Sequence, residues 1–222
     1  MAQAISKLIT FDEFIDWINE NSGVRYELHN GEIAEMSQPT GKHERIKGFS
    51  AAELTVEFRR LNLPYFIPNQ VIVKPPSRES GYFPDVLILN GNALADEPLW
   101  EKSSTVTKGT SIPLVIEVVS TNWRDDYYLK LADYEQMGIP EYWIAEDTAL
   151  DGFPGLKQVS ADYAALGARK FIGNPKQPTI SVYQLVDGEY QVSQFRDSDK
   201  IISPTFPELN LTVEQVFNAG EI

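Results

Sequence analysis

The sequence predicts an α/β (α+β) fold, in which a mixed β-sheet is flanked by helices. Three apolar runs rich in β-branched residues, at 65–74, 83–90 and 112–120, have the length and composition of strands. Helical periodicity precedes them at about 43–61 and follows them at about 123–137. No glycine-rich phosphate loop follows any strand, so the fingerprints of dinucleotide-binding and P-loop folds are missing.

The N-terminal part, residues 10–36, predicts a helix and a hairpin. Thr10 and Glu13 match a capping box, and the apolar residues that follow recur at helical spacing. Asn30 and Gly31 lie between two alternating runs, a strong signal for a β-hairpin turn.

The C-terminal half predicts further elements around one core at about 41–147. Gly138 suits the end of the third helix, and residues 141–146 follow as a strand. Residues 90–111 are expected to form a long surface loop with solvated charges. Residues 148–217 are expected to leave the core as an irregular segment and then form a hairpin with its turn at Asp187-Gly188. A short helix capped by Thr212 is expected at the end of the sequence. Residues 1–222 are thus expected to form a single domain.

Composition excludes several classes of site. The chain has no cysteine and two histidines, which excludes thiolate sites and argues against a multi-histidine zinc or iron centre. No apolar run is long enough to cross a membrane and the start lacks a signal core, so we expect a cytoplasmic protein. The net charge of −13 argues against a broad nucleic-acid-binding face.

Two carboxylates on apolar strands indicate a metal site. Glu117 lies in an otherwise apolar run, where a charge is costly unless it is paired or binds a cation. Asp85 is the one charge in its own run. Each residue has a structural alternative. Glu117 could be an edge-strand glutamate that reaches solvent or a member of a buried ion pair, and Asp85 could be a turn residue. If the two strands are neighbours, the pair makes an oxygen site suited to Mg²⁺.

Three other side chains could take part. Lys130 follows Glu117 along the chain and shares a helical face with Tyr127, Tyr134 and Met137. It could act beside a metal-bound phosphate, or it could extend to water. Glu27 reads as an exposed hairpin glutamate, and His43 as a solvated histidine of a first helical turn. Arg124, Asp125 and Asp126 form a charged helix start for which a structural role suffices.

Several strings, taken in order, resemble one family. PDVLIL, LVIEVVS and DDYYLKLADYEQMGIPEYW resemble the Uma-type restriction endonucleases, a branch of the PD-(D/E)xK nuclease superfamily. YELHNGEIAEM and SPTFPELNLTVEQVF also look like this family. The resemblance spans about residues 11–217 and implies a restriction-endonuclease-like core.

The resemblance also implies roles for individual residues. Pro84-Asp85 matches the PD motif and Glu117 matches the second acidic residue. Val119 stands where the general pattern has lysine, and the Uma-type branch resembles a version in which a helix lysine, here Lys130, has taken its place. Glu27 looks like an additional acidic residue of the site, and His43 like an accessory helix histidine.

The two carboxylates together with the resemblance imply a Mg²⁺-dependent endonuclease that hydrolyses DNA, with Mn²⁺ as a substitute ion. Asp85, Glu117 and the Val118 backbone carbonyl would bind the metal. Two alternatives stay open: a weak or inactive nuclease fold that binds protein or nucleic acid, and a phosphoesterase acting on small nucleotides. A homodimer is also expected, which could gather cations of one helix beside a cleft: Lys42, Arg45, Lys47, Arg59 and Arg60.

Overall fold

The centre of the molecule is a six-stranded mixed sheet. The computed structural model describes residues 8–21, 23–119, 124–147, 171–173 and 176–221. The strand order is β10-β9-β8-β7-β5-β3, and β7 and β8 run parallel while the other neighbours are antiparallel. The predicted mixed sheet is therefore confirmed.

The strands of this sheet differ in length, and the longest two lie at one edge. They are β3 (Tyr65–Phe66), β5 (Val86–Asn90), β7 (Leu114–Val118), β8 (Glu141–Glu146), β9 (Thr179–Val186) and β10 (Glu189–Arg196). The predicted hairpin at Asp187-Gly188 is confirmed as the β9–β10 connection. Two further strands, β4 (Ile72–Val73) and β6 (Thr105–Val106), form a separate parallel pair.

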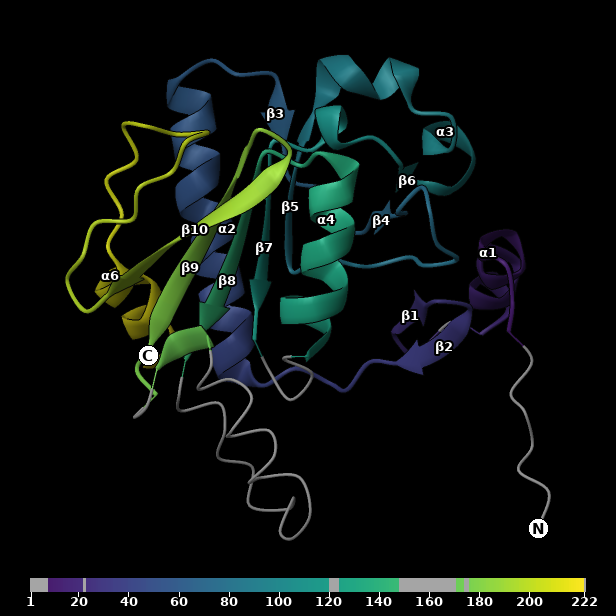
Figure 1. Ribbon diagram of the computed structural model, residues 1–222, viewed down its shortest axis with the longest axis horizontal. Helices are drawn as coiled ribbons and strands as arrows, with labels where there is room; N and C mark the ends of the chain where they lie inside the picture. Colours follow the sequence, from purple (N-terminus) through teal and green to yellow (C-terminus); the bar gives the residue numbers. More distant parts are fainter. Residues whose placement is uncertain (1–7, 22, 120–123, 148–170, 174–175, 222) are drawn as a thin grey trace, which may run out of the picture.

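Helices cover both faces of the sheet. Because side chains alternate along a strand, Ile116 and Val118 of β7 pack on one face while Val115 packs on the other. Helices α2 (Gly41–Arg60) and α6 (Val213–Asn218) cover the first face, and α4 (Leu131–Met137) covers the second. In Figure 1, α2 lies behind the sheet and α4 in front of it.

The helix that carries Lys130 has an unusual first part. Residues Asp125–Lys130 form a π-helical turn that runs directly into α4. Gly138 ends α4 with a φ of +78°, a left-handed conformation that favours glycine, as the sequence predicts. The predicted first residue of this helix, at position 123, lies outside the described residues.

The N-terminal unit consists of α1 (Phe11–Glu20) and a hairpin of β1 (Tyr26–His29) and β2 (Glu32–Glu35). The predicted capping box at Thr10 is confirmed. Leu28 and Gly81 exchange backbone hydrogen bonds of 3.0 and 2.9 Å, which attach the hairpin to the chain just before β5. Gly81 has no room for a side chain, because a Cβ there would lie 2.9 Å from the Phe11 ring.

Two predicted segments differ from the structure. Residues 65–74 do not form one strand; they divide into β3 and β4 around Pro68, which has no N–H to donate to a ladder. The predicted loop at 90–111 contains a 3₁₀ helix (Gly91–Asp96), the short helix α3 (Trp100–Ser103) and β6. Glu97 is buried there instead of solvated, and it accepts hydrogen bonds from the backbone N–H groups of Thr107 and Lys108.

The predicted excursion after β8 lies mostly outside the described residues, since 148–170 and 174–175 are not described. The predicted last helix is confirmed as α6, and Thr212 caps it by accepting a hydrogen bond from the Gln215 N–H. Among the helices that the structure describes, none combines the length and apolar character needed to cross a bilayer.

Candidate metal-binding active site

Glu117 of β7 is buried on the face of the sheet that α4 covers. Its side chain is 3% exposed, and Val115 and Val119, two residues to either side, pack on the same face. The Tyr134 hydroxyl of α4 donates a hydrogen bond of 3.2 Å to Glu117 Oε1. The carboxylate is therefore held inside the protein and does not reach water from an edge strand.

Lys130 supplies the positive charge at this position. Its Nζ lies 3.0 Å from Glu117 Oε1 and 3.4 Å from both Glu27 Oε1 and Asp126 Oδ1. The ammonium is 3% exposed, so it does not extend to solvent. The π-helical turn directs both Asp126 and Lys130 inward, a kind of distortion often found at functional sites.

Asp85 connects this cluster to the next strand. It comes directly before β5, and its Oδ2 accepts a hydrogen bond of 2.9 Å from the Val118 N–H. The Asp85 N–H donates a hydrogen bond of 3.4 Å to Glu117 Oε2, and β5 pairs with β7, so the two strands are neighbours as the prediction required. His43 Nε2 is 3.2 Å from Asp85 Oδ2, and Lys47 Nζ is 3.9 Å from Oδ1.

Glu27 is buried, which overturns its prediction as an exposed hairpin residue. The backbone bonds between Leu28 and Gly81 place β1 against the chain that leads to β5. Glu27 is consequently 1% exposed and accepts a hydrogen bond of 2.9 Å from the Phe83 N–H. Its other oxygen lies 2.9 Å from His29 Nε2.

His43 is also buried rather than solvated, with an exposed fraction of 5%. Thr40 caps α2 by accepting a hydrogen bond from the His43 N–H, which fixes the first turn beside β5. From there the imidazole meets Asp85, while its Nδ1 has no hydrogen-bond partner and lies 3.4 Å from Glu44.

Asp126 belongs to the cluster, although the sequence pattern favoured a role at the helix start for it. It is 7% exposed and faces Lys130 four residues later. That four-residue spacing, which places two side chains on one helical face, was the signal that could have identified it.

Negative charge exceeds positive charge in the cluster. Burial raises the pKa of Glu117 well above its usual range; Lys130 opposes this shift, and Asp126 and Asp85 add to it. Burial likewise raises the pKa of Asp126 to about 7, against the effect of Lys130. Burial alone would lower the pKa of Lys130, but Glu117, Glu27 and Asp126 raise it well above the usual value. These shifts mark a site that would be stabilised by further positive charge.

The outer carboxylates shift in the opposite direction. Burial would raise the pKa of Asp85, but the hydrogen bond and charge of His43 outweigh it, so this pKa is lowered. The pKa of Glu27 is also lowered, because Lys130 and His29 outweigh the effect of its burial. Burial would lower the pKa of His43, yet Asp85 raises it.

On Asp85 and Glu117 the less engaged oxygens are Oδ1 and Oε2, because His43 and the Val118 N–H contact Asp85 Oδ2 while Lys130 and Tyr134 contact Glu117 Oε1. Hard oxygen donors of this kind fit Mg²⁺, which takes one or two protein carboxylates and completes its shell with water. Across the described residues, no group of three or more His, Asp or Glu side chains is arranged to hold a metal. Two carboxylates plus the Val118 carbonyl are thus the donor set to consider; this carbonyl should point toward Asp85, as the Val118 N–H does.

Val119 occupies the position where the general nuclease motif has its lysine. Its side chain is 4% exposed and packs in the apolar layer beneath α4. Lys130 reaches Glu117 from the helix instead. The substituted arrangement that the family resemblance implies is therefore geometrically possible in this chain.

Comparison with known proteins identifies the family of this chain. A family model described as "Putative restriction endonuclease", Uma2, matches residues 11–214. The chain belongs to the Uma2 family. It is also similar to a crystal structure from Anabaena variabilis described as a putative nuclease belonging to DUF820, with a TM-score of 0.65 and 15% identity. That likeness covers 96% of this chain and 99% of the other and shows a shared fold, whereas no curated protein is similar enough to count as a match.

A groove of about 660 Å³ leads to the cluster in this Uma2-family chain. It runs between α1, the start of α2 and the segments around Asn69 and Phe83, and Asp85 lies in its wall together with Lys47. Asp85 has 11% of its side chain exposed, more than Glu117 or Lys130. A ligand in the groove would therefore meet the cluster at Asp85.

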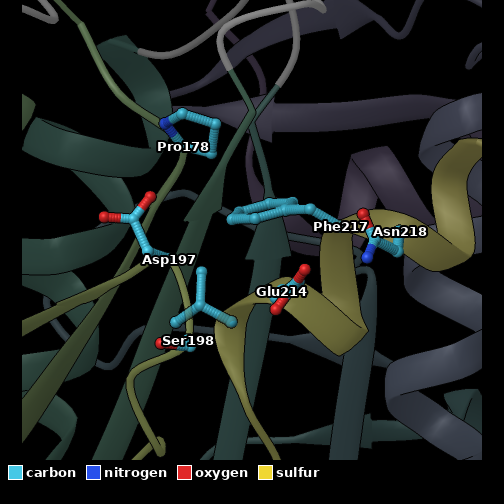
Figure 2. A pocket seen from close by; sticks show the side chains of 7 residues that line it. Pro178, Asp197, Ser198, Glu214, Phe217 and Asn218 are labelled. Atoms are coloured by element: carbon cyan, nitrogen blue, oxygen red, sulfur yellow. The ribbon is translucent and has the colours of Figure 1, made fainter.

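A second hollow, of about 360 Å³, lies elsewhere in the molecule. Figure 2 shows Asp197, Glu214 and Phe217 around it, contributed by α6 and the segment after β10. None of its described lining residues belongs to the groove or to the carboxylate cluster, and none is a lysine, arginine or histidine. We assign no chemistry to it.

Proposed function

We propose that this protein is a Mg²⁺-dependent endonuclease that hydrolyses DNA phosphodiester bonds. The family model carries the description "Putative restriction endonuclease", and one observation in this chain supports the finer statement: Asp85 and Glu117 are neighbours, with the Lys130 ammonium 3.0 Å from Glu117. Paired carboxylates beside a lysine are a suitable set for metal-assisted attack on a phosphodiester.

Asp85, Glu117 and the Val118 carbonyl would hold the Mg²⁺, and Mn²⁺ could replace it. The bound ion would supply Lewis-acid chemistry, polarising the phosphoryl group and acidifying the attacking water. His43 and the Val118 N–H fix the Asp85 carboxylate through Oδ2, which leaves Oδ1 directed toward the groove side, where Lys47 lies.

Lys130 would provide a fixed positive charge for the attacking oxygen or for the charge that develops on the phosphate. Glu27 and Asp126 hold its ammonium from two further sides, so it cannot turn away from Glu117. Glu27 is thereby a positioning residue in this proposal, and His43 positions Asp85 in the same sense.

Cleavage assays with purified protein test the proposal. Plasmid and single-stranded DNA would be incubated with Mg²⁺, with Mn²⁺ and with EDTA, beside the Lys130→Ala variant. We expect cleavage with either ion, none in EDTA and a loss of at least about a hundredfold in the variant. Native protein that binds the ions and leaves both substrates intact would contradict it.

One observation favours a second candidate, a nuclease fold that works by binding. Lys130, Glu27, Glu117 and Asp126 form a closed buried ion network, an arrangement that structural ion pairs also adopt. Ion binding without cleavage would support this reading. Cleavage of small nucleotides with none of polymeric DNA would instead support a phosphoesterase.

The expected homodimer and the cytoplasmic location stay predictions. Light scattering on the purified protein tests the first, because a dimer doubles the 25.0 kDa mass of the chain. The DNA partner is tested by the cleavage assay itself.

A further inference from the structure

The groove beside Asp85 continues well past the candidate site. A second hollow of about 560 Å³ adjoins it and reaches α3, where Lys102, Ser103 and Ser104 line it. The two hollows adjoin, and together they are called the channel here; they share five lining residues: Ile18, Val24, Gln70, Val71 and Phe83. The channel thus runs from Lys47 and Asp85 at one end to Lys102 at the other.

The lining of this channel combines apolar, amide and charged side chains. Apolar groups from the N-terminal unit and the segment before β5 form its walls, including Ile15, Ile18, Val24, Tyr26 and Phe83. Amide side chains are interspersed along it, namely Asn19, Asn21, Gln38, Asn69 and Gln70. Three cations, Arg25, Lys47 and Lys102, line it together with two carboxylates, Glu44 and Asp85.

This combination fits an unpaired nucleic-acid strand. Single strands bind in grooves where bases stack on aromatic and apolar surfaces while scattered cations follow the phosphates. Amide side chains can hydrogen-bond base edges, which are free only when the strand is unpaired. A channel of this size is within the range that holds a few nucleotide-sized groups.

Duplex DNA fits the surface less well, because its binding relies on a row of cations that contact phosphates on both strands. Several cations of α2 are already paired with other groups of the same chain. Lys42 contacts Asp147 and Glu221, and Arg60 contacts Glu57 and Glu208. Arg45 donates to the backbone carbonyl of Gly220.

We propose that the channel lined by Val24, Phe83, Gln70 and Lys102 binds a single strand of nucleic acid and delivers it to Asp85. This inference rests on the proposed nuclease function for the role of Asp85, but binding in the channel does not depend on cleavage. The preferred substrate would then be unpaired DNA or RNA, or a splayed strand end, in preference to an intact duplex.

Val24→Glu tests the channel directly. Val24 lines both parts of it and is 46% exposed, so a carboxylate can be placed there without burying a charge. Val192→Glu on β10 is the matched control, because this valine is 51% exposed and lines neither part. Lys102→Ala, with Lys200→Ala as its control, provides a second pair in case the first variant folds poorly.

Binding would be measured by fluorescence anisotropy with labelled 12-nucleotide single strands of DNA and of RNA and with the 12-base-pair DNA duplex. Ca²⁺ replaces Mg²⁺ to limit cleavage. We expect single strands to bind more tightly than duplex, and Val24→Glu to weaken that binding at least about tenfold while Val192→Glu leaves it unchanged. Lys102→Ala should weaken it by a smaller factor. The ratio of DNA to RNA affinity then states which strand is preferred.

Equal affinity for single strand and duplex would overturn the inference, as would single-strand binding that neither Val24→Glu nor Lys102→Ala weakens. Failure of the nuclease proposal looks different: the strand binds in the channel and stays intact in Mg²⁺. If the protein cleaves duplex DNA and Val24→Glu does not change the rate, the nuclease proposal would hold and the proposed role of the channel would be rejected.

Discussion

Lys130 lies 3.0 Å from Glu117 although the two are thirteen positions apart in the chain and belong to different elements. The nearer position on the strand, Val119, packs in the apolar core, so the positive charge beside Glu117 comes from the helix on the same face. The π-helical turn of Asp125–Lys130 gives the helix its inward-facing charges at this point. The helix that positions Lys130 beside Glu117 is therefore the same helix that packs on the apolar core around Val119.

Removing the ammonium should destabilise the protein strongly. Lys130→Met leaves Glu117, Glu27 and Asp126 buried without their common partner, and breaking a buried ion pair from one side costs about 3–5 kcal/mol. Urea unfolding followed by tryptophan fluorescence measures the free energy of unfolding.

The double variant Lys130→Met, Glu117→Gln is its control, because it replaces one of the buried carboxyl groups that lose their partner. We expect it to be more stable than Lys130→Met alone. Equal stability of the native protein and Lys130→Met would show that the ammonium is not engaged as the distances indicate.

The metal-free protein should lose stability as the pH rises toward neutrality. The pKa of Asp126 is raised from 3.8 to about 7 by burial, against the effect of Lys130. A raised carboxyl pKa means that the folded state keeps a proton that the unfolded chain releases, so this contribution is complete below pH 3.8 and is lost as the pH approaches 7. The raised pKa of Glu117 acts in the same direction. Thermal unfolding between about pH 5 and 7 measures the effect.

Asp126→Asn should reduce this pH dependence. Some dependence should remain, because the raised pKa of His43 also gives stability that is lost with rising pH. Asp85 and Glu27, whose pKa values are lowered, give the opposite slope, but mainly below their unfolded values of 3.8 and 4.5. A variant with an unchanged slope between pH 5 and 7 would argue against the assignment to Asp126.

Gly109 should be needed for the close packing of the chain against the C-terminal end of α4, the helix that continues from Lys130. A Cβ at Gly109 would lie 2.4 Å from the Met137 carbonyl oxygen and 2.6 Å from the Gly138 carbonyl carbon, both of them backbone atoms. Gly109→Ala should therefore destabilise the protein by about 1–3 kcal/mol. Chemical denaturation checks this value.

Gly48→Ala is the matched control for that substitution. Gly48 lies within α2 and a Cβ there meets nothing within 4 Å, so alanine should stabilise the helix by about 0.5–1 kcal/mol. Opposite signs for the two variants would support the packing described here. A neutral Gly109→Ala would show that α4 can shift at its end.

Much of the fold could be predicted from sequence because its signals are local. The capping box of Thr10, the hairpin turn at Asn30-Gly31 and the left-handed Gly138 each depend on a few neighbouring residues. The apolar strands that follow Asp85 and contain Glu117 could also be predicted from their composition. Residues 65–74 were predicted as one strand from their length and β-branched composition, although Pro68 divides them.

The site could be predicted in part. Asp85 and Glu117 are conspicuous as single charges in apolar runs, and the structure brings them together. The local pattern of Glu27 predicted exposure, although the resemblance gave it a role in the site, because its burial depends on the contact between Leu28 and Gly81, which lie far apart in the chain. His43 was misread for a similar reason, since Asp85 buries it from another element.

Divalent-ion binding tests the central claim most directly, because it does not depend on which substrate the protein takes. Mn²⁺ binding would be followed by electron paramagnetic resonance for the native protein, Glu117→Gln and Glu141→Gln. Glu141 is a matched control: it is also a fully buried strand glutamate, but its oxygens accept hydrogen bonds from Trp143, Ser203 and the Thr205 N–H. We predict that the native protein and Glu141→Gln bind the ion and that Glu117→Gln does not. Equal binding by all three, or none by the native protein, would contradict a metal site at Asp85 and Glu117.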